Sequence, residues 1–172
     1  NTLEDLYREE QDSGKSIYGR INFLMKNRHG TPFEHNALKW YVEAPIFVFR
    51  EWHRHRIGVS YNEMSGRYTQ LPPTYYVPNE KRNLVQIGKP GAYDFVPGDT
   101  ETYEWLVQDM KEEALSNYGR YQARLDRGIA KEVARMSLGV NIYSAMYFTA
   151  NARSLMAILS LRTKHPESKF PS

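Results

Sequence analysis

The sequence predicts an α+β fold in which a mixed or antiparallel sheet is flanked by helices. Two observations lead to this prediction. Stretches with helical spacing of apolar residues alternate with short stretches rich in β-branched and aromatic residues, and no repeat or low-complexity linker separates them. With 172 residues, 41% of them apolar, the chain can build a core. We expect a single domain over residues 1–172 that lacks residues at both ends, because Asn1 is an unusual first residue and no helix stop precedes Ser172.

The first element is predicted to be a helix over residues 16–28, with its apolar residues on one face. Residues 29–32 carry a turn signal. Thr31 then suits the cap of a short helix, with Pro32 at its first position and Glu34 in the capping-box position. This capping pattern explains all three residues without a function.

Residues 36–43 alternate between apolar and polar side chains, which favours a strand. Pro45 suits the first turn of a helix that runs to His55. Residues 46–48 also fit a buried strand, and periodicity does not decide between the two interpretations.

Residues 71–98 are rich in proline and glycine and are predicted to be mostly loop. Asp99 or Thr100 caps the clearest helix, which runs to about Arg127 and stops at Gly128. Its apolar stripe consists of Tyr103, Leu106, Val107, Met110, Ala114, Leu115, Tyr118 and, less clearly, Tyr121.

Three elements are predicted in the last part of the chain. Residues 130–138 form a short helix, and residues 140–149 form a strand rich in Ile, Tyr and Phe. Asn151 caps a final helix over residues 152–162.

Composition limits the possible functions. The chain has no cysteine, which excludes a cysteine nucleophile, a zinc–thiolate site and a disulfide within these residues. The net charge is only +3, so positive charge matters through its clustering. No apolar run has the length of a membrane span and no signal peptide is recognisable, so we expect a cytoplasmic protein that does not bind a membrane.

The densest polar segment is residues 54–67, RHRIGVSYNEMSGR, which contains three Arg, one His, one Glu, two Ser and one Asn. It shows no helical or strand period that would separate these side chains. Its anion-binding and hydrogen-bonding groups suit a nucleotide site better than a core element.

The basic residues in and before this segment allow more than one interpretation. Arg50, His53, Arg54, His55 and Arg56 are a solvated basic face if Glu43 and Glu51 pair with them. The flanking aromatic residues Phe47, Phe49 and Trp52 favour a binding site instead. A zinc site lacks a third ligand, so no metal site is predicted, and Ser65 does not lie in the elbow motif of a serine hydrolase.

Other polar residues have ordinary explanations when each is considered alone. His29 suits a surface histidine, Arg135 and Arg153 suit exposed helix positions, and Arg162 suits compensation of a helix dipole.

Together, five stretches resemble the flavin-dependent thymidylate synthases, also called thymidylate synthase complementing proteins. They are Thr31 to His35, Ala44 to Val48, Arg54 to Tyr68, Glu132 to Arg135 and Asn151 to Leu155. The specific part is an Arg-His-Arg run, a short spacer and a serine, and the resemblance covers about residues 16–165.

The resemblance implies the fold of that family and the reductive methylation of dUMP to dTMP. Methylenetetrahydrofolate would give the one-carbon unit, and FAD reduced by NADPH would give the hydride, without a cysteine nucleophile. It also implies a homotetramer in which several chains build each site.

The resemblance further implies roles for individual residues. Residues for FAD would be Thr31, Glu34, Arg54, His55, Arg56, Ile57, Asn151 and Arg153. Residues for dUMP would be Glu63, Met64, Ser65, Gly66, Arg67, Arg162 and, from a neighbouring subunit, Arg135. Residues nearest the chemistry would be Arg162, which polarises the uracil, Ser65 as a hydrogen-bonding group, and His29 beside flavin and folate.

The chain also departs from the family pattern. The spacer from Arg56 to Ser65 has eight residues where seven are usual, Glu51 replaces a common Gln, Gly139 a usual Pro, and Ala157 a polar flavin contact. Two alternatives therefore stay open. One is a module that binds single-stranded nucleic acid through its basic and aromatic residues, and the other is an inactive flavin-binding relative.

Overall fold

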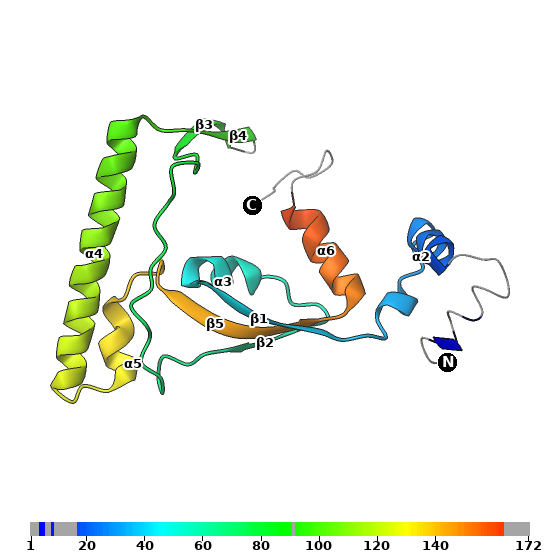
Figure 1. Ribbon diagram of the computed structural model, residues 1–172, viewed down its shortest axis with the longest axis horizontal. Coiled ribbons are helices and arrows are strands. Elements are labelled where there is room, and N and C mark those ends of the chain that lie inside the picture. Colours follow the sequence, from blue (N-terminus) through cyan, green and yellow to red (C-terminus); the bar gives the residue numbers. More distant parts are fainter. Residues whose placement is uncertain (1–3, 6–7, 9–16, 91, 164–172) are drawn as a thin grey trace. The chain divides into compact units, whose positions relative to one another are not determined.

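The computed structural model describes residues 4, 5, 8, 17–90 and 92–163 and has an α+β architecture, as predicted (Figure 1). A three-stranded sheet has the strand order β1-β5-β2, and a separate antiparallel hairpin consists of β3 and β4. The elements are α2 (Ile17–Lys26), η1 (Thr31–Phe33), β1 (Leu38–Pro45), α3 (Ile46–Trp52), β2 (Val59–Glu63), β3 (Val85–Lys89), β4 (Ala92–Val96), α4 (Thr100–Asp126), α5 (Lys131–Ala134), η2 (Arg135–Ser137), β5 (Tyr143–Ala150) and α6 (Ala152–Arg162).

The chain divides into two compact units. Unit 1 comprises Asn1–Trp40, Arg56–Ser60 and Thr149–Ser172. Unit 2 comprises Tyr41–His55 and Tyr61–Phe148. Most of the buried core lies in unit 2, where the largest fully buried side chains are Tyr121, Phe49, Phe148, Ile142 and Met146.

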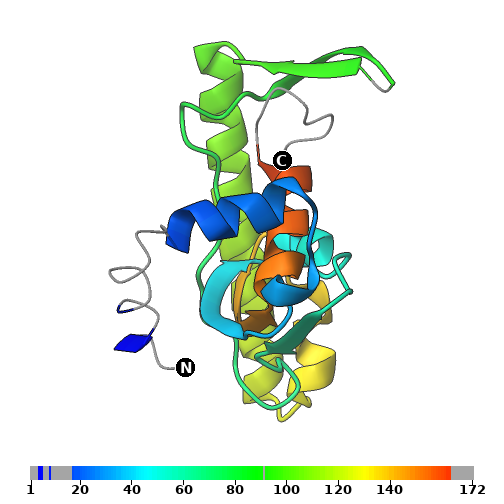
Figure 2. The same cartoon turned by 90° about the vertical axis from the view of Figure 1, so that its right-hand side faces the viewer.

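Helix α4 begins and ends as its sequence predicts. The Asp99 carboxylate accepts a hydrogen bond from the backbone N–H of Thr102 at 2.7 Å, which satisfies one of the free amides of the first turn. Gly128 follows the last turn with φ +74°, a conformation that glycine adopts without strain. α5 lies beside the C-terminal part of α4 (Figures 1 and 2).

The apolar stripe predicted on α4 is only partly buried. Ala114, Tyr118 and Tyr121 are buried, whereas Leu115 is 76% exposed, so its place in the buried stripe was wrong. The two tyrosines pack with Ala134, and Tyr75, Leu125 and Leu138 cover this cluster.

The predicted helix after Pro45 exists but is shorter, and the strand interpretation of residues 46–48 was wrong. Pro45 lies outside the helix as its N-cap, with ψ 147°, and not in the first turn. The backbone N–H groups of Ile46 and Phe47 donate to the carbonyls of Ile142 and Val140 at 2.9 Å each. These bonds satisfy the free amides of the helix start, which explains why a helix can begin directly after a strand.

The end of α3 also corrects the prediction, because the helix stops at Trp52 and not at His55. The hydroxyl of Tyr61 binds the carbonyl of Trp52 at 3.0 Å and that of His55 at 2.5 Å. A side chain from β2 therefore binds carbonyls at the end of the helix and just after it.

Four further predictions need correction. Strand β2 lies inside the segment where no period was recognised, and residues 71–98 contain the β3–β4 hairpin. The helix over residues 130–138 is split, because the N–H of Leu138 bonds to the carbonyl of Arg135 in a tighter turn. Gly30, and not Thr31, is the N-cap of η1.

Candidate functional site

In unit 1, one neighbouring and one distant side chain fix the start of α6. The side chain of Asn151 accepts from the N–H of Ser154 at 2.8 Å, as its position predicted. The side chain of Asn36 accepts from the N–H of Ala152 at 2.7 Å. Two amides of the first helical turn are thus satisfied within the unit, and Arg153 projects between them from a fixed backbone.

Arg153 forms an ion pair with Glu34. Glu34 therefore pairs across unit 1 and does not serve the capping box that its position predicted. Gly30 allows this arrangement, because a Cβ on it would lie only 2.7 Å from the Arg153 Cζ. A guanidinium close to bare backbone is typical of sites that approach an anion or a planar ligand.

The turn that carries Gly58 packs against the same helix start. Gly58 has φ +66°, and a Cβ on it would lie 2.2 Å from the Ser154 Oγ. Just before it, the side chain of Ile57 is 91% exposed and Arg56 is also exposed.

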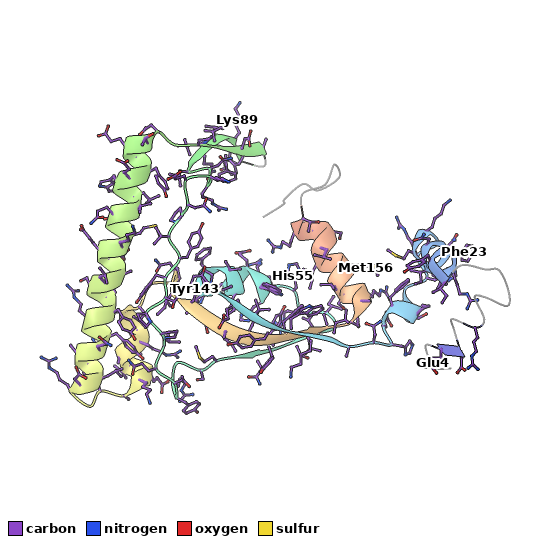
Figure 3. All side chains as sticks on the ribbon, in the orientation of Figure 1. Glu4, Phe23, His55, Lys89, Tyr143 and Met156 are labelled. Atoms are coloured by element: carbon purple, nitrogen blue, oxygen red, sulfur yellow. The ribbon has the colours of Figure 1, made fainter. Side chains whose placement is uncertain are left out.

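His29 packs near the end of α2 in the same unit. The ring of Phe23, on α2, stacks on the His29 ring with centroids 6.2 Å apart. Phe23 is labelled in Figure 3, as is Met156 on α6.

In unit 2, the segment from Met64 to Leu71, called the 64–71 loop below, leaves β2 through a tight turn. The Met64 N–H donates to the carbonyl of Ala145 at 2.8 Å. The Ser65 carbonyl accepts from the N–H groups of Tyr68 and Thr69 at 3.1 and 3.0 Å, and the Ser65 Oγ accepts from the Arg67 N–H at 3.3 Å. The bonds to Ser65 thus close the turn that contains Gly66 and Arg67.

One arginine lies in this loop and a second packs against it. Arg67 forms an ion pair with Glu132 at 3.1 Å and lies over the Tyr68 ring at 5.7 Å from the centroid. Arg135 lies against Gly66, where a Cβ would be 3.2 Å from the Arg135 Cδ and 3.3 Å from its Nη1. A guanidinium beside a bare, buried backbone, with a second arginine next to it in the loop, is an arrangement that suits a phosphate.

Helix α4 fixes the position of Arg135. Arg124 on α4 donates to the carbonyl of Ala134 at 3.1 Å and to the hydroxyl of Ser137. Ala134 directly precedes Arg135 and Ser137 follows it by two residues, so this segment is held on both sides of Arg135.

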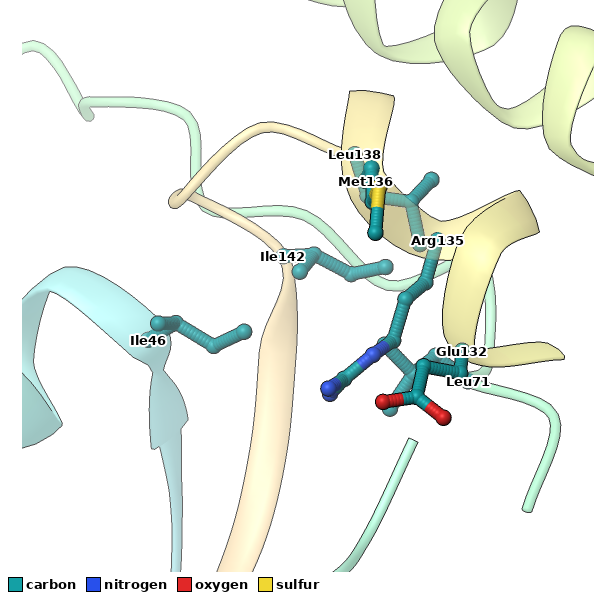
Figure 4. A pocket seen from close by; sticks show the side chains of 7 residues that line it. All are labelled: Ile46, Leu71, Glu132, Arg135, Met136, Leu138 and Ile142. Carbon is teal, nitrogen blue, oxygen red and sulfur yellow. The ribbon is translucent and has the colours of Figure 1, made fainter. Parts of the chain in front are cut away.

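A cavity of about 290 Å³ opens beside this arginine. Figure 4 shows the polar ends of Arg135 and Glu132 together, with apolar side chains along the other walls. Its lining consists of Ile46, Leu71, Glu132, Arg135, Met136, Leu138 and Ile142. A charged end and an apolar wall are the usual features of a pocket for a small ligand.

The sequence matches one protein family over almost its whole length. The family described as thymidylate synthase complementing protein matches residues 1–168. This chain belongs to that family.

The similar proteins have consistent names. The flavin-dependent thymidylate synthase of Tropheryma whipplei (strain TW08/27) is 57% identical over 154 residues, covering 90% of this chain and 64% of that protein. The flavin-dependent thymidylate synthase of Streptomyces coelicolor is 50% identical over 171 residues, covering 99% of this chain and 68% of that protein. The chain thus spans about two thirds of the length of these relatives.

A solved structure is also similar. The UMP/dUMP methylase PolB from Streptomyces cacaoi, bound with 5-Br UMP, has a TM-score of 0.85 and 45% identity, covering 92% of this chain and 70% of that one. Its complex with 5-Br dUMP has a TM-score of 0.81 and 41% identity.

The structure groups the residues that the family resemblance singled out. Unit 1 holds His29, Thr31, Glu34, Arg56, Ile57, Asn151, Arg153 and Arg162. Unit 2 holds Arg54, His55, Glu63, Met64, Ser65, Gly66, Arg67 and Arg135. Direct contact is seen between Glu34 and Arg153 and between Gly66 and Arg135. Arg135 makes this contact within one chain, and its role in a neighbouring subunit's site stays a prediction.

Sequence reasoning missed several residues that shape these sites. Tyr61 holds the carbonyl of His55, and Tyr118 and Tyr121 bond to Leu71 at the end of the 64–71 loop. The only signal was the spacing of Tyr118 and Tyr121 on the buried face of α4, which indicated packing and not a hydrogen-bonding role.

Two findings concern metal sites and membrane-spanning helices in the described residues. Within residues 4–5, 8, 17–90 and 92–163, no group of three or more His, Cys, Asp or Glu side chains is placed to hold a metal. In the same residues no helix has the length and apolarity needed to cross a membrane.

Proposed function

We propose that this chain carries the nucleotide and flavin sites of an enzyme that methylates dUMP to dTMP. The observation that carries the proposal is the corner where Gly66, Arg67 and Arg135 meet in a chain of this family. This corner offers two guanidinium groups and a buried glycine backbone to one anion, as a nucleotide 5′-phosphate requires.

The residues around the corner have separable roles in binding dUMP. Gly66 leaves room for an anion to approach the backbone, and Arg67 offers a planar fork of N–H donors. Glu132 holds Arg67 in the structure, so phosphate would have to compete with this carboxylate. Ser65 would contribute hydrogen bonds only, because its Oγ accepts from the Arg67 N–H and no base is bonded to it among the described contacts.

The residues of unit 1 fit an anionic dinucleotide such as FAD. Arg56 and Arg153 are exposed cations, and Ile57 presents an apolar side chain that is 91% exposed and available to cover a ring. When bound and reduced by NADPH, FAD supplies the hydride, and methylenetetrahydrofolate supplies the carbon. Arg162 would stabilise the anionic form of the uracil, and His29 would lie beside flavin and folate. A homotetramer with shared sites belongs to the same proposal.

The visible absorption spectrum of the purified full chain is the first test. A flavin spectrum that NADPH bleaches without oxygen, followed by dTMP formation from dUMP, supports the proposal. If no flavin is bound or taken up from added FAD, the flavin-binding role is wrong for this chain.

UMP is a second candidate substrate, because a solved structure 45% identical to this chain is that of a UMP/dUMP methylase. The two nucleotides differ only in the 2′-hydroxyl, and a site that does not bond this group discriminates weakly between them. Parallel assays with dUMP and UMP, with methylated products separated by chromatography, decide which nucleotide is preferred.

The nucleic-acid interpretation receives less support. Arg67 and Arg153, two cations outside the basic cluster of residues 50–56 on which it depends, have carboxylate partners in Glu132 and Glu34, so they add little charge to that cluster. Such pairs weaken the positive field that non-specific backbone binding requires.

A further inference from the structure

Two buried tyrosines of α4 hold the peptide groups on either side of Leu71. The Tyr118 hydroxyl donates to the Leu71 carbonyl at 3.0 Å, and the Leu71 N–H donates to the Tyr121 Oη at 3.4 Å. Tyr121 is 0% exposed and Tyr118 is 9% exposed. Each hydroxyl therefore satisfies a backbone group that has little access to water.

Leu71 connects these tyrosines to the phosphate corner. Its side chain is 5% exposed and lines the same cavity as Arg135. A Cβ on Gly66 would lie 3.4 Å from the Leu71 Cδ1, so Leu71 packs directly under the glycine. A shift of Leu71 would therefore also move the backbone of Gly66.

The 64–71 loop is thereby fixed at both ends. At its start, the Met64 N–H bonds to Ala145 on β5, and at its end Leu71 bonds to α4. Between these points lie the turn at Ser65 and the exposed Arg67. A loop held in this way presents its N–H groups and its arginine in one geometry, and such preorganisation lowers the entropic cost of binding an anion.

We propose that Tyr118 and Tyr121 are positioning residues for the nucleotide phosphate and act through the peptide groups of Leu71. This inference rests on the proposed function, since it assumes that the corner binds the phosphate of dUMP. Neither hydroxyl contacts the nucleotide, and both set the position of the loop that does.

Isothermal titration of the flavin-loaded full chain tests this inference with two probes, dUMP and deoxyuridine, which lacks the phosphate. The variants are Tyr118→Phe and Tyr121→Phe. The matched control is Tyr103→Phe, which also removes a tyrosine hydroxyl from α4. That hydroxyl donates to the carbonyl of Pro78 at 3.2 Å, away from the 64–71 loop.

The Kd for dUMP should rise about three- to tenfold in Tyr118→Phe and Tyr121→Phe, the effect of one hydrogen bond. The Kd for deoxyuridine should stay as in the unchanged protein, and Tyr103→Phe should bind both probes normally. In an Arg67→Ala background, the rise in the Kd for dUMP caused by either tyrosine substitution should be smaller. The loop then no longer carries the arginine that it positions.

The outcomes separate the two proposals. If the unchanged protein binds dUMP no better than deoxyuridine, both the proposed function and the inference fail. If it prefers dUMP and the two variants keep that preference, only the inference fails. An equal loss for both probes also overturns it, because that result indicates general loosening. Should Tyr121→Phe not fold, Tyr118→Phe alone decides, since its hydroxyl bonds to the same residue.

Discussion

Arg135 lies against the backbone of Gly66, so closely that a Cβ at position 66 would come within 3.2 Å of the Arg135 side chain. The two residues are far apart in the sequence, and Arg124 on α4 helps to bring them together by holding the carbonyl of Ala134. The sequence motif around Gly66 is thus completed by a residue that belongs to another segment of the same chain.

Gly66→Ala should displace Arg135 by a few tenths of an ångström, because the new methyl group needs the space that the arginine stem occupies. We expect the Kd for dUMP to rise several-fold, with a stability loss below about 1 kcal/mol because the arginine can move. Titration with dUMP and urea unfolding measure the two effects. Unchanged dUMP affinity would show that this contact does not shape the site.

Gly119→Ala is predicted to have the opposite effect on stability. Gly119 lies within α4, and a Cβ there meets nothing within 4 Å. Since alanine loses less conformational entropy in a helix, the free energy of unfolding should increase by about 0.5–1 kcal/mol. Urea unfolding measures this change, and dUMP affinity should not change with it. A destabilised variant would mean that α4 has a neighbour at this position in the assembled protein.

Gly58→Ala should destabilise unit 1. The left-handed backbone at φ +66° costs a residue with a side chain about 1–2 kcal/mol, and the methyl group would overlap the Ser154 Oγ. We expect less bound flavin as well, because Asn151 lies 3.2 Å from the same point. The double variant with Ser154→Ala should recover part of the stability. If the single variant is as stable as the unchanged protein, the turn does not pack as described.

The alkaline stability of the protein should depend on Tyr75. Burial, and secondarily Tyr118, raises the pKa of Tyr75 from 10.0 to about 12. Below pH 10 the phenol is protonated whether the chain is folded or unfolded, so it makes no pH-dependent contribution. Between pH 10 and 12 the unfolded chain ionises and the folded chain does not, so stability falls as the pH rises.

Tyr75→Phe should remove this part of the loss of stability at alkaline pH. Its buried hydroxyl makes no hydrogen bond within the described part of the chain, so the variant should be at least as stable near neutral pH. Thermal unfolding at several pH values checks both statements. An unchanged slope between pH 10 and 12 would contradict the assignment to Tyr75.

Local chemistry explains which parts of the fold could be predicted. Asp99 and Asn151 cap helices through side-chain bonds to amides three residues ahead, so the signal lies entirely within a short stretch of sequence. Gly128 stops α4 for an equally local reason.

The missed elements depend on partners that are distant or leave no local pattern. β2 is defined by its sheet neighbour β5 and by Tyr61, whose ring packs on His53 and Phe148. The residues of β3 are all exposed, so no alternation of buried and exposed positions marks them as a strand. Glu34 fitted a local capping box, but the cation of Arg153 stabilises its carboxylate instead.

The residues of the candidate site also divide into those with a local sequence signal and those without one. The residues of the Arg-His-Arg run and the first part of the 64–71 loop, Met64 to Arg67, could be named from the sequence, because the family motif contains them. Tyr118 and Tyr121 could not, since a hydrogen bond to Leu71 across 47 and 50 positions leaves no trace in local sequence.

The release of tritium from dUMP labelled at C5 tests the central claim most directly. The assay uses the flavin-loaded full chain with NADPH and methylenetetrahydrofolate. We predict release that requires the folate and the reductant and that matches the dTMP formed, because methylation at C5 must displace that hydrogen. No release from a protein that binds and reduces its flavin would contradict the proposed function.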